Sequence, residues 1–321
     1  MSLRPLLAVL AAALSSLNAA PALACASCGC ALSSDWESQG YNAGPGWRLD
    51  LRYDYINQNE LRSGADKVNR AAFPPGPGQE HELEQVTSNR YFTVGIDYSP
   101  NKDWSFNAQI PYVDRFHQTI TPGETAVSES DTNELGDIRL TARYQGFNEA
   151  RNIGVSLGLK LPTGEYRQNF SAGPEAGNPL DRGLQAGTGT TDLLLGAFRF
   201  GALNRDWDWF AQVQYQHALS ERDGYRPGDA LNLSGGLRYV AHEGVTPELQ
   251  VNVQHRRADS GANADVDNSG GTITYLSPGL SVAVGKQARL YGYVQLPVHF
   301  QLEGLQLAPR WTASAGVRYA F

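Results

Sequence analysis

The sequence predicts an all-β protein: a transmembrane antiparallel β-barrel of 12 strands, with short periplasmic turns and long extracellular loops. Three observations predict this fold. Apolar residues recur at every second position in segments that follow one another from residue 46 onwards. The connections between these segments alternate between short and long, and the last segment ends on an aromatic residue, Phe321. A period of two with one apolar face is typical of a half-buried strand.

The amino end has the layout of a secretory signal peptide. Arg4 supplies a positive charge, an apolar run over 6–14 follows, and the triplet Ala22-Leu23-Ala24 provides a small-x-small cleavage site. The run is too short to span a bilayer as a helix. We therefore expect three regions: a signal peptide over 1–24, a cysteine-containing N-terminal segment over 25–45, and the barrel over 46–321.

The first expected strand, residues 47–55, shows the alternation most clearly. One face carries Trp47, Leu49, Leu51, Tyr53 and Tyr55, and the other carries Arg48, Asp50, Arg52 and Asp54. The other strands are expected over 89–98, 104–113, 136–145, 153–162, 191–200, 207–218, 230–240, 246–257, 272–284, 288–300 and 310–321. Most are near the ~9–11 residues of a tilted membrane strand.

The connections predict how the barrel is oriented. Those after even-numbered strands are short: SPNKD, GFNEARN, GALNRD, AHEGV and GKQ. Those after odd-numbered strands are mostly long and include 57–88, 114–135, 163–190 and 258–271. This pattern, with an even number of strands, is that of bacterial outer-membrane barrels. It places both termini in the periplasm and the long loops outside.

Aromatic residues are expected to form two girdles at the membrane interfaces, where amphipathic rings prefer to lie. We assign Trp47, Trp104, Trp207, Trp209 and Trp311 to strand starts on the short-turn side, and Tyr53, Tyr55 and Tyr112 to the opposite side. Outer-membrane lipid is therefore an expected partner of the apolar faces.

The polar faces are expected to line the lumen. These residues are Arg48, Asp50, Arg52, Asp54, Asp137, Arg139, Arg143, Lys160, Asp208, Gln212, Gln214, Glu248, Gln250, Asn252, Gln254 and Arg256. Segment 153–162 contributes only Gly154, Ser156 and Gly158 opposite its apolar face, which leaves room. A barrel of this size is wider than one that side chains fill. The lumen is thus either a hydrated pore or a closed, salt-bridged interior. Because basic and acidic residues are interleaved, neither anions nor cations are favoured.

Three cysteines, Cys25, Cys28 and Cys30, lie within the expected N-terminal segment. Thiolates at this spacing, with Gly29 allowing a tight bend, suit a soft metal ion such as Cu(I) or Zn(II). A disulfide or redox tether in the oxidising periplasm is a second interpretation. Acylation of Cys25 directly after signal cleavage is a third. A thiol left over from a disulfide would be available to a periplasmic protein partner.

The composition and motifs disfavour several other functions. A formal net charge of −7 disfavours nucleic acid as a partner. No histidine belongs to the His-x-Ser pair of outer-membrane phospholipases, so we expect no catalytic residue and no enzyme. Asp114 and His117 lie near each other in sequence but are expected in a solvated loop. Residues 263–270 resemble a calcium loop without its distal Glu, which favours a polar turn.

Several stretches resemble the outer-membrane barrels grouped as meta-pathway phenol-degradation-like, or MetA, transporters. They are GDIRLTARYQGF (136–147), LGLKLPTGE (157–165), GTGTTDLLLGA (187–197) and the terminal GVRYAF. The terminal Phe321 also resembles the signal read by the barrel insertion machinery. The resemblance implies a porin-like channel for a small, aromatic or hydrophobic solute. Two alternatives stay open: a metal-handling barrel that uses the CxxCxC cysteines, and a closed scaffold that docks a periplasmic partner.

Overall fold

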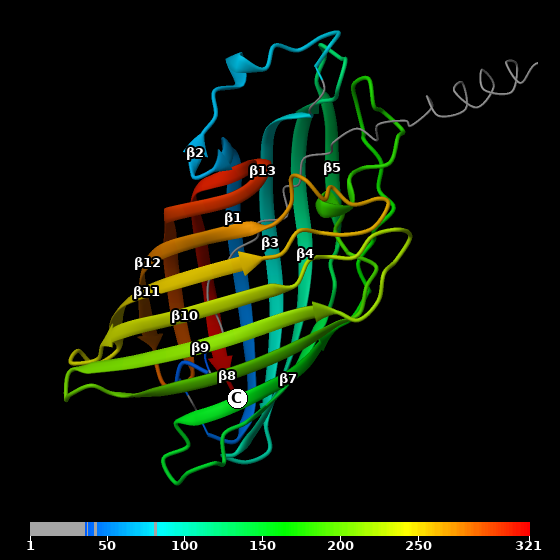
Figure 1. The fold of residues 1–321 in the computed structure, drawn as a ribbon. Helices are drawn as coiled ribbons and strands as arrows, with labels where there is room; N and C mark the ends of the chain where they lie inside the picture. Colours follow the sequence, from blue (N-terminus) through cyan, green and yellow to red (C-terminus); the bar gives the residue numbers. More distant parts are fainter. Residues whose placement is uncertain (1–35, 37, 42–43, 80–81) are drawn as a thin grey trace, which may run out of the picture.

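Antiparallel strands follow one another around a closed barrel in the computed structural model, which describes residues 36, 38–41, 44–79 and 82–321 (Figure 1). The strands are β1 (Gly46–Gly64), β2 (Asp66–Lys67), β3 (Leu83–Ser99), β4 (Trp104–Ile120), β5 (Ser128–Leu135), β6 (Arg139–Tyr144), β7 (Ile153–Lys160), β8 (Asp192–Ala202), β9 (Trp207–Ala218), β10 (Ala230–Tyr239), β11 (Val245–Arg256), β12 (Gly271–Val284) and β13 (Ala288–Ala320). Two 3-10 turns, η1 (Arg70–Ala72) and η2 (Arg182–Leu184), lie in the loops.

The ring closes between the first and last strands. In the antiparallel register of β1 and β13, Arg48 lies opposite Ala320 and Ile56 opposite Thr312. The amide of Phe321 extends this pairing by donating to the carbonyl of Trp47 (3.0 Å). Closure removes the open edges that would otherwise leave backbone groups unpaired.

Eleven strands form the ring, and β2 and β5 pair outside its path. β2 pairs with the end of β1, and β5 pairs with the second half of β4. The first half of β4 pairs with β6 instead, so the segment expected over 136–145 begins as a strand only at Arg139. The expected segments 288–300 and 310–321 belong to one element, β13. Its first part pairs with β12 and its last part with β1.

Three strands are longer than expected. β1 continues to Gly64, β3 begins at Leu83 and β4 continues to Ile120. These extensions pair with one another, as at Gln58 and Thr87. Their sequences, for example NQNELR over 57–62, are polar on both faces and therefore show no alternation to detect.

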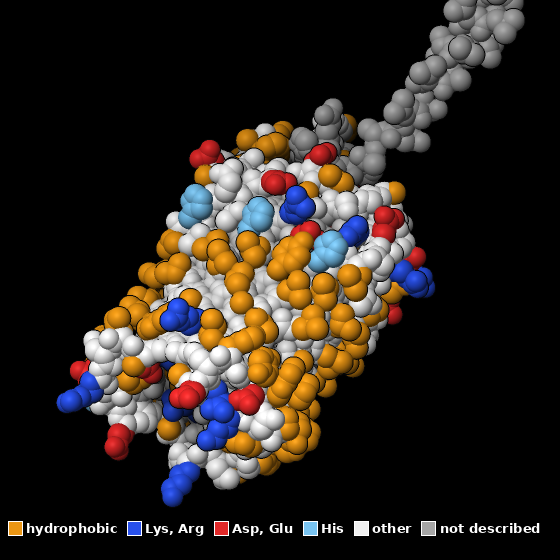
Figure 2. Space-filling view, turned by 60° about the horizontal axis from the view of Figure 1, so that its bottom comes forward, with side chains coloured by type: hydrophobic (Ala, Val, Ile, Leu, Met, Phe, Trp, Pro, Cys, Tyr) orange, Lys and Arg blue, Asp and Glu red, His pale blue; other side chains and the backbone are white. Residues whose placement is uncertain are grey.

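The apolar faces point outward, as expected. Leu157 and Val251 are 58% and 48% exposed, whereas Gln250 and Asn252, which flank Val251 and point inward, are fully buried. Hydrophobic side chains cover the middle of the face seen in Figure 2, and charged side chains gather towards its ends. Within the described residues, no helix has the length and apolar character that crossing a membrane as a helix requires.

The girdle at the short-turn end is built from tryptophan–tyrosine contacts. Ring centroids lie 4.5 Å apart for Trp47 and Tyr98 and 5.1 Å apart for Trp207 and Tyr239. The assignment of Trp311 to this end is wrong. Its ring lies 5.5 Å from Tyr55, in the middle of β1 and away from Trp47. The reason is that the segment 310–321 runs antiparallel to β1, so Phe321 and not Trp311 lies beside Trp47.

Candidate functional site in the barrel lumen

A cavity of about 400 Å³ occupies the interior of the barrel. Ten of the sixteen residues expected in the lumen surround this cavity: Arg52, Asp54, Asp137, Arg139, Arg143, Lys160, Gln212, Gln214, Gln254 and Arg256. The other six, Arg48, Asp50, Asp208, Glu248, Gln250 and Asn252, are not part of its lining. Of these, Asp50 lines a second cavity of about 20 Å³, which has room for roughly one water molecule.

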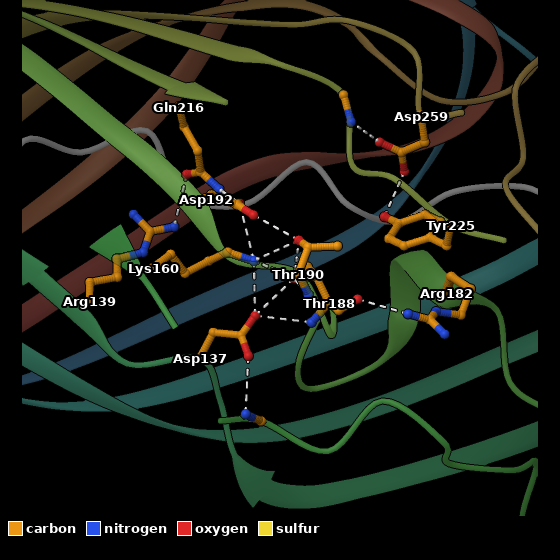
Figure 3. A network of polar contacts seen from close by, with 12 residues as sticks. Asp137, Arg139, Lys160, Arg182, Thr188, Thr190, Asp192, Gln216, Tyr225 and Asp259 are labelled. Atoms are coloured by element: carbon orange, nitrogen blue, oxygen red, sulfur yellow. Dashed lines mark hydrogen bonds and ion pairs between the residues drawn. The ribbon is translucent and has the colours of Figure 1, made fainter. Parts of the chain in front are cut away.

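Lys160 is the centre of a buried polar network between β6, β7 and β8. Its Nζ lies 3.0 Å from Asp137 Oδ2 and 3.1 Å from Asp192 Oδ2, and it donates to Thr188 (Figure 3). The strand register places Arg139, Lys160 and Asp192 side by side. The sequence did not indicate Asp192 because the segment 191–200 is largely apolar on both faces, so its inner face was not evident.

Asp137 also binds both ends of the long connection between β7 and β8. Its carboxylate accepts hydrogen bonds from the amides of Gly164 and Thr188, both at 3.0 Å. A Cβ on Gly187 would lie 2.4 Å from the carbonyl oxygen of Gly164, and one on Gly164 would lie 2.9 Å from the carbonyl carbon of Gly136. Only glycine permits these backbones to approach so closely.

Most other charged residues of the lumen are paired. Arg52 Nε lies 2.8 Å from Asp54 Oδ2, and Arg143 Nη1 lies 3.5 Å from Asp97 Oδ1. Further from these, Arg238 pairs with Asp208 (3.8 Å) and Arg256 with Asp259 (3.3 Å). The interleaving of charges seen in the sequence therefore becomes a set of ion pairs, some within one strand or its following loop and some between strands.

Arg139 is the exception among the basic residues that line the large cavity. It forms no ion pair with any described residue, and its Nη2 donates instead to Gln216 Oε1 (3.4 Å). Gln216 Nε2 in turn donates to Asp192 Oδ2 (2.5 Å), which orients the amide (Figure 3). The guanidinium thus faces the cavity with a neutral group as its only described hydrogen-bond partner.

The remaining predicted lumen residues are held by hydrogen bonds. In each of the following pairs the first side chain donates to the second: Arg48 to Ser99 Oγ (2.5 Å), Tyr291 Oη to Asp50 (2.7 Å), Gln250 to Glu248 (2.5 Å), Tyr293 Oη to Glu248 (3.1 Å) and Asn252 to Ser277 (2.9 Å). Gln214 and Gln254 line the cavity from β9 and β11.

The room left by the glycines of β7 is filled from the next strand. A Cβ on Gly154 would lie 2.3 Å from Phe198 Cζ, so the phenyl ring occupies that space. Phe198 and Leu194 are 5% and 2% exposed, and both line the cavity. The lumen therefore has apolar side chains on β8 beside the polar ones of β6 and β7.

Residues 36, 38 and 41 lie inside the barrel, which the sequence did not indicate because they precede the alternating segments. The ring of Trp36 lies 4.9 Å from Tyr291 and 4.5 Å from Tyr41, and Ser38 Oγ donates to Gln212 Oε1 (2.5 Å). Tyr41 packs on Arg238, at the end of β10 next to a short connection. Cys25, Cys28 and Cys30, the expected metal ligands, lie outside the described residues.

Asp114 and His117 do not form a pair. Asp114 pairs with Arg90 (3.1 Å) outside the barrel, whereas His117 is fully buried and its Nδ1 shares a hydrogen bond with Thr87 (2.8 Å). The expectation of a solvated loop is therefore wrong for His117. The two residues are separated by three positions on a strand, which places their side chains on opposite faces.

Comparisons with known proteins agree with this fold. Residues 84–321 match the family described as "Putative MetA-pathway of phenol degradation". None of the curated proteins matches the chain significantly by sequence. The structure is similar to the COG4313 outer membrane channel from Pseudomonas putida F1, with a TM-score of 0.61, 14% identity, and coverage of 86% of this chain and 96% of that one.

Two further solved structures align with most of the chain. The β domain of the Bordetella autotransporter BrkA gives a TM-score of 0.49 and 15% identity, with 86% of this chain and 100% of that chain covered. The Pseudomonas putida toluene transporter TodX gives a TM-score of 0.46 and 10% identity, with 86% of this chain and 90% of that chain covered.

Proposed function

The chain belongs to the MetA-pathway family of phenol degradation, and on this premise we propose that it is a channel that passes a small molecule across the bacterial outer membrane. One observation carries the proposal: a cavity of about 400 Å³ lies inside a closed barrel whose outer surface is apolar. Cavities of roughly 300–1,000 Å³ are typical of small-molecule sites. The similarity in fold to an outer membrane channel supports the same conclusion.

We propose that both termini face the periplasm and that the chain crosses the membrane twelve times, as the sequence predicts. The amide of Ala320 donates to the carbonyl of Gln287 (2.8 Å), so the end of the chain lies beside the short connection between β12 and β13. Thr312 also donates to Gln295 (2.9 Å), and Gly304 has a φ of 64°. These contacts support counting β13 as two crossings joined by a turn.

The passage is narrow at the end where Trp36 packs among tyrosines. Trp36 lines the cavity of about 20 Å³. We infer that conduction requires Trp36 and its neighbours to move away from Tyr291 and Tyr293, because a roughly water-sized space does not admit an organic solute.

Planar lipid bilayers test the proposal directly. Purified full-length protein should produce discrete current steps, and proteoliposomes should admit small aromatic solutes faster than empty liposomes do. The absence of both current and solute entry, with a correctly folded and inserted barrel, would reject the channel function. A scaffold barrel would behave in that way.

A further inference from the structure

The lining of the large cavity is unequal in charge. Five basic side chains line it, Arg52, Arg139, Arg143, Lys160 and Arg256, but only two acidic ones, Asp54 and Asp137. Two other carboxylates that pair with these bases, Asp97 and Asp192, are buried and do not line this cavity, although Asp97 lines the smaller one. A solute inside the cavity therefore meets mainly positive groups.

Arg139 is the basic group that a solute would reach without displacing an ion pair. Among the described residues its only hydrogen-bond partner is Gln216. Asp137 and Asp192 attract Arg139, but Lys160 already binds both carboxylates. Arg52 and Arg256 repel it. An anion at this point would give the Arg139 guanidinium a charged acceptor, because a guanidinium can bind a carboxylate through two parallel hydrogen bonds.

Apolar side chains also line the same cavity, from two parts of the wall. Tyr91, Pro111, Val113, Leu194 and Phe198 line it from β3, β4 and β8. Apolar groups lining a pocket favour a solute with an apolar body, whereas the few polar groups fix its orientation. Inorganic anions would gain nothing from these side chains.

We propose that the cavity binds a small organic carboxylate with a compact apolar body, its carboxylate on Arg139 and its body against Leu194 and Phe198. The proposal rests on the channel function and names the class of solute for that channel. It also departs from the sequence, in which interleaved charges indicate no preference between anions and cations.

Three probes of similar size test it: benzoate, neutral benzyl alcohol and cationic benzylamine. Their entry into proteoliposomes is measured for the wild-type protein and for Arg139→Gln. Arg205→Gln is the matched control, because Arg205 is exposed in the connection between β8 and β9. We expect the wild type and the control to favour benzoate. Arg139→Gln should reduce the benzoate preference about tenfold, as expected when a charge-assisted bond is lost.

Arg139→Lys separates charge from geometry. It should keep part of the preference, since it retains the charge without the planar fork. Equal entry of the three probes into wild-type proteoliposomes would overturn the proposal. The proposal would also be overturned if Arg139→Gln left the benzoate preference unchanged while a detergent gel showed that the variant forms a normal, heat-resistant barrel.

A binding measurement distinguishes failure of this proposal from failure of the channel function. If no probe enters, the channel function fails, and calorimetric titration of benzoate into detergent-solubilised protein decides the binding proposal. The binding proposal is supported if benzoate binds saturably to the wild type and about tenfold more weakly to Arg139→Gln. The absence of binding to the folded wild type would overturn it.

Discussion

Lys160 and Asp192 form a buried ion pair across neighbouring strands, with Nζ 3.1 Å from Oδ2 and side chains 4% and 1% exposed. The same ammonium group binds Asp137 at 3.0 Å. One cation thus holds two carboxylates, and through Asp137 it holds both ends of the connection between β7 and β8. Lys160 thus joins β7, β8 and the connection between them.

Lys160→Met should strongly destabilise the barrel. The substitution leaves Asp137 and Asp192 buried without their cation, and breaking a buried pair in this way costs roughly 3–5 kcal/mol. The measurement is thermal unfolding in detergent, followed by circular dichroism. Lys67→Met is the control, because Lys67 is 59% exposed and pairs only at the surface. Equal stability of the two variants would contradict the prediction.

Gly187→Ala should disturb the same region through the backbone. The added methyl group would lie 2.4 Å from the carbonyl oxygen of Gly164, so the two ends of the connection between β7 and β8 must separate. Overpacking of this kind costs roughly 1–3 kcal/mol. In Gly235→Ala, the nearest atom would be 3.6 Å away, and we expect little change. Urea or thermal unfolding of both variants would check this difference.

Trp36→Ala should increase single-channel conductance. The indole ring fills the lumen between Tyr41 and Tyr291, and its removal would widen the narrow end. Trp207→Ala removes an aromatic side chain of equal size from the outer surface and should leave the conductance unchanged. An unchanged conductance in Trp36→Ala would show that the restriction lies elsewhere.

Asp265, in the connection between β11 and β12, should make loop stability depend on pH. Burial, with repulsion from Asp267 and Asp259, raises its pKa to about 6, while bonds from Asn268 oppose the shift. Because the folded state binds this proton more tightly, its stabilising effect is complete below about pH 4 and is lost as the pH rises through 6. The full effect is on the order of 3 kcal/mol.

Asp265→Asn tests that assignment. The variant should be more stable than the wild type at pH 7.5 and should show a weaker pH dependence between 4 and 7. Hydrogen exchange over residues 257–270 is the appropriate measurement. Asp181, which Asp265 also repels, has a pKa raised well above its usual value by burial and retains its own pH dependence in the variant. A wild-type loop whose protection is constant from pH 4 to 7 would contradict the prediction.

The cysteine segment should bind a soft metal ion if Cys28 and Cys30 act as thiolate ligands. Protein folded in the periplasm should then contain Zn(II) or Cu(I), and the double variant Cys28→Ser, Cys30→Ser should not. Elemental analysis of both proteins measures this. An equal metal content would exclude the thiolates as ligands, and a disulfide would show instead as a mass difference on reduction.

The sequence by itself determined the barrel and part of its inner surface. Alternation with a period of two depends only on neighbouring residues, so the outward Leu157 and the inward Lys160 could both be assigned from the chain. The same rule fails where both faces are polar, as at the end of β1, or largely apolar, as around Asp192. It also cannot tell at which end of the barrel a residue such as Trp311 lies until the strand direction is known.

Only the tertiary structure decided the pairing of charges inside the lumen. Which carboxylate meets which base depends on strand register and on loops that enter from distant parts of the chain, as Thr188 does at Lys160. The sequence shows mixed charges, and the fold pairs Arg52, Arg143, Lys160 and Arg256 while leaving Arg139 with the amide of Gln216. Ion pairs form between residues that are close in space, and sequence alternation carries no information about that distance.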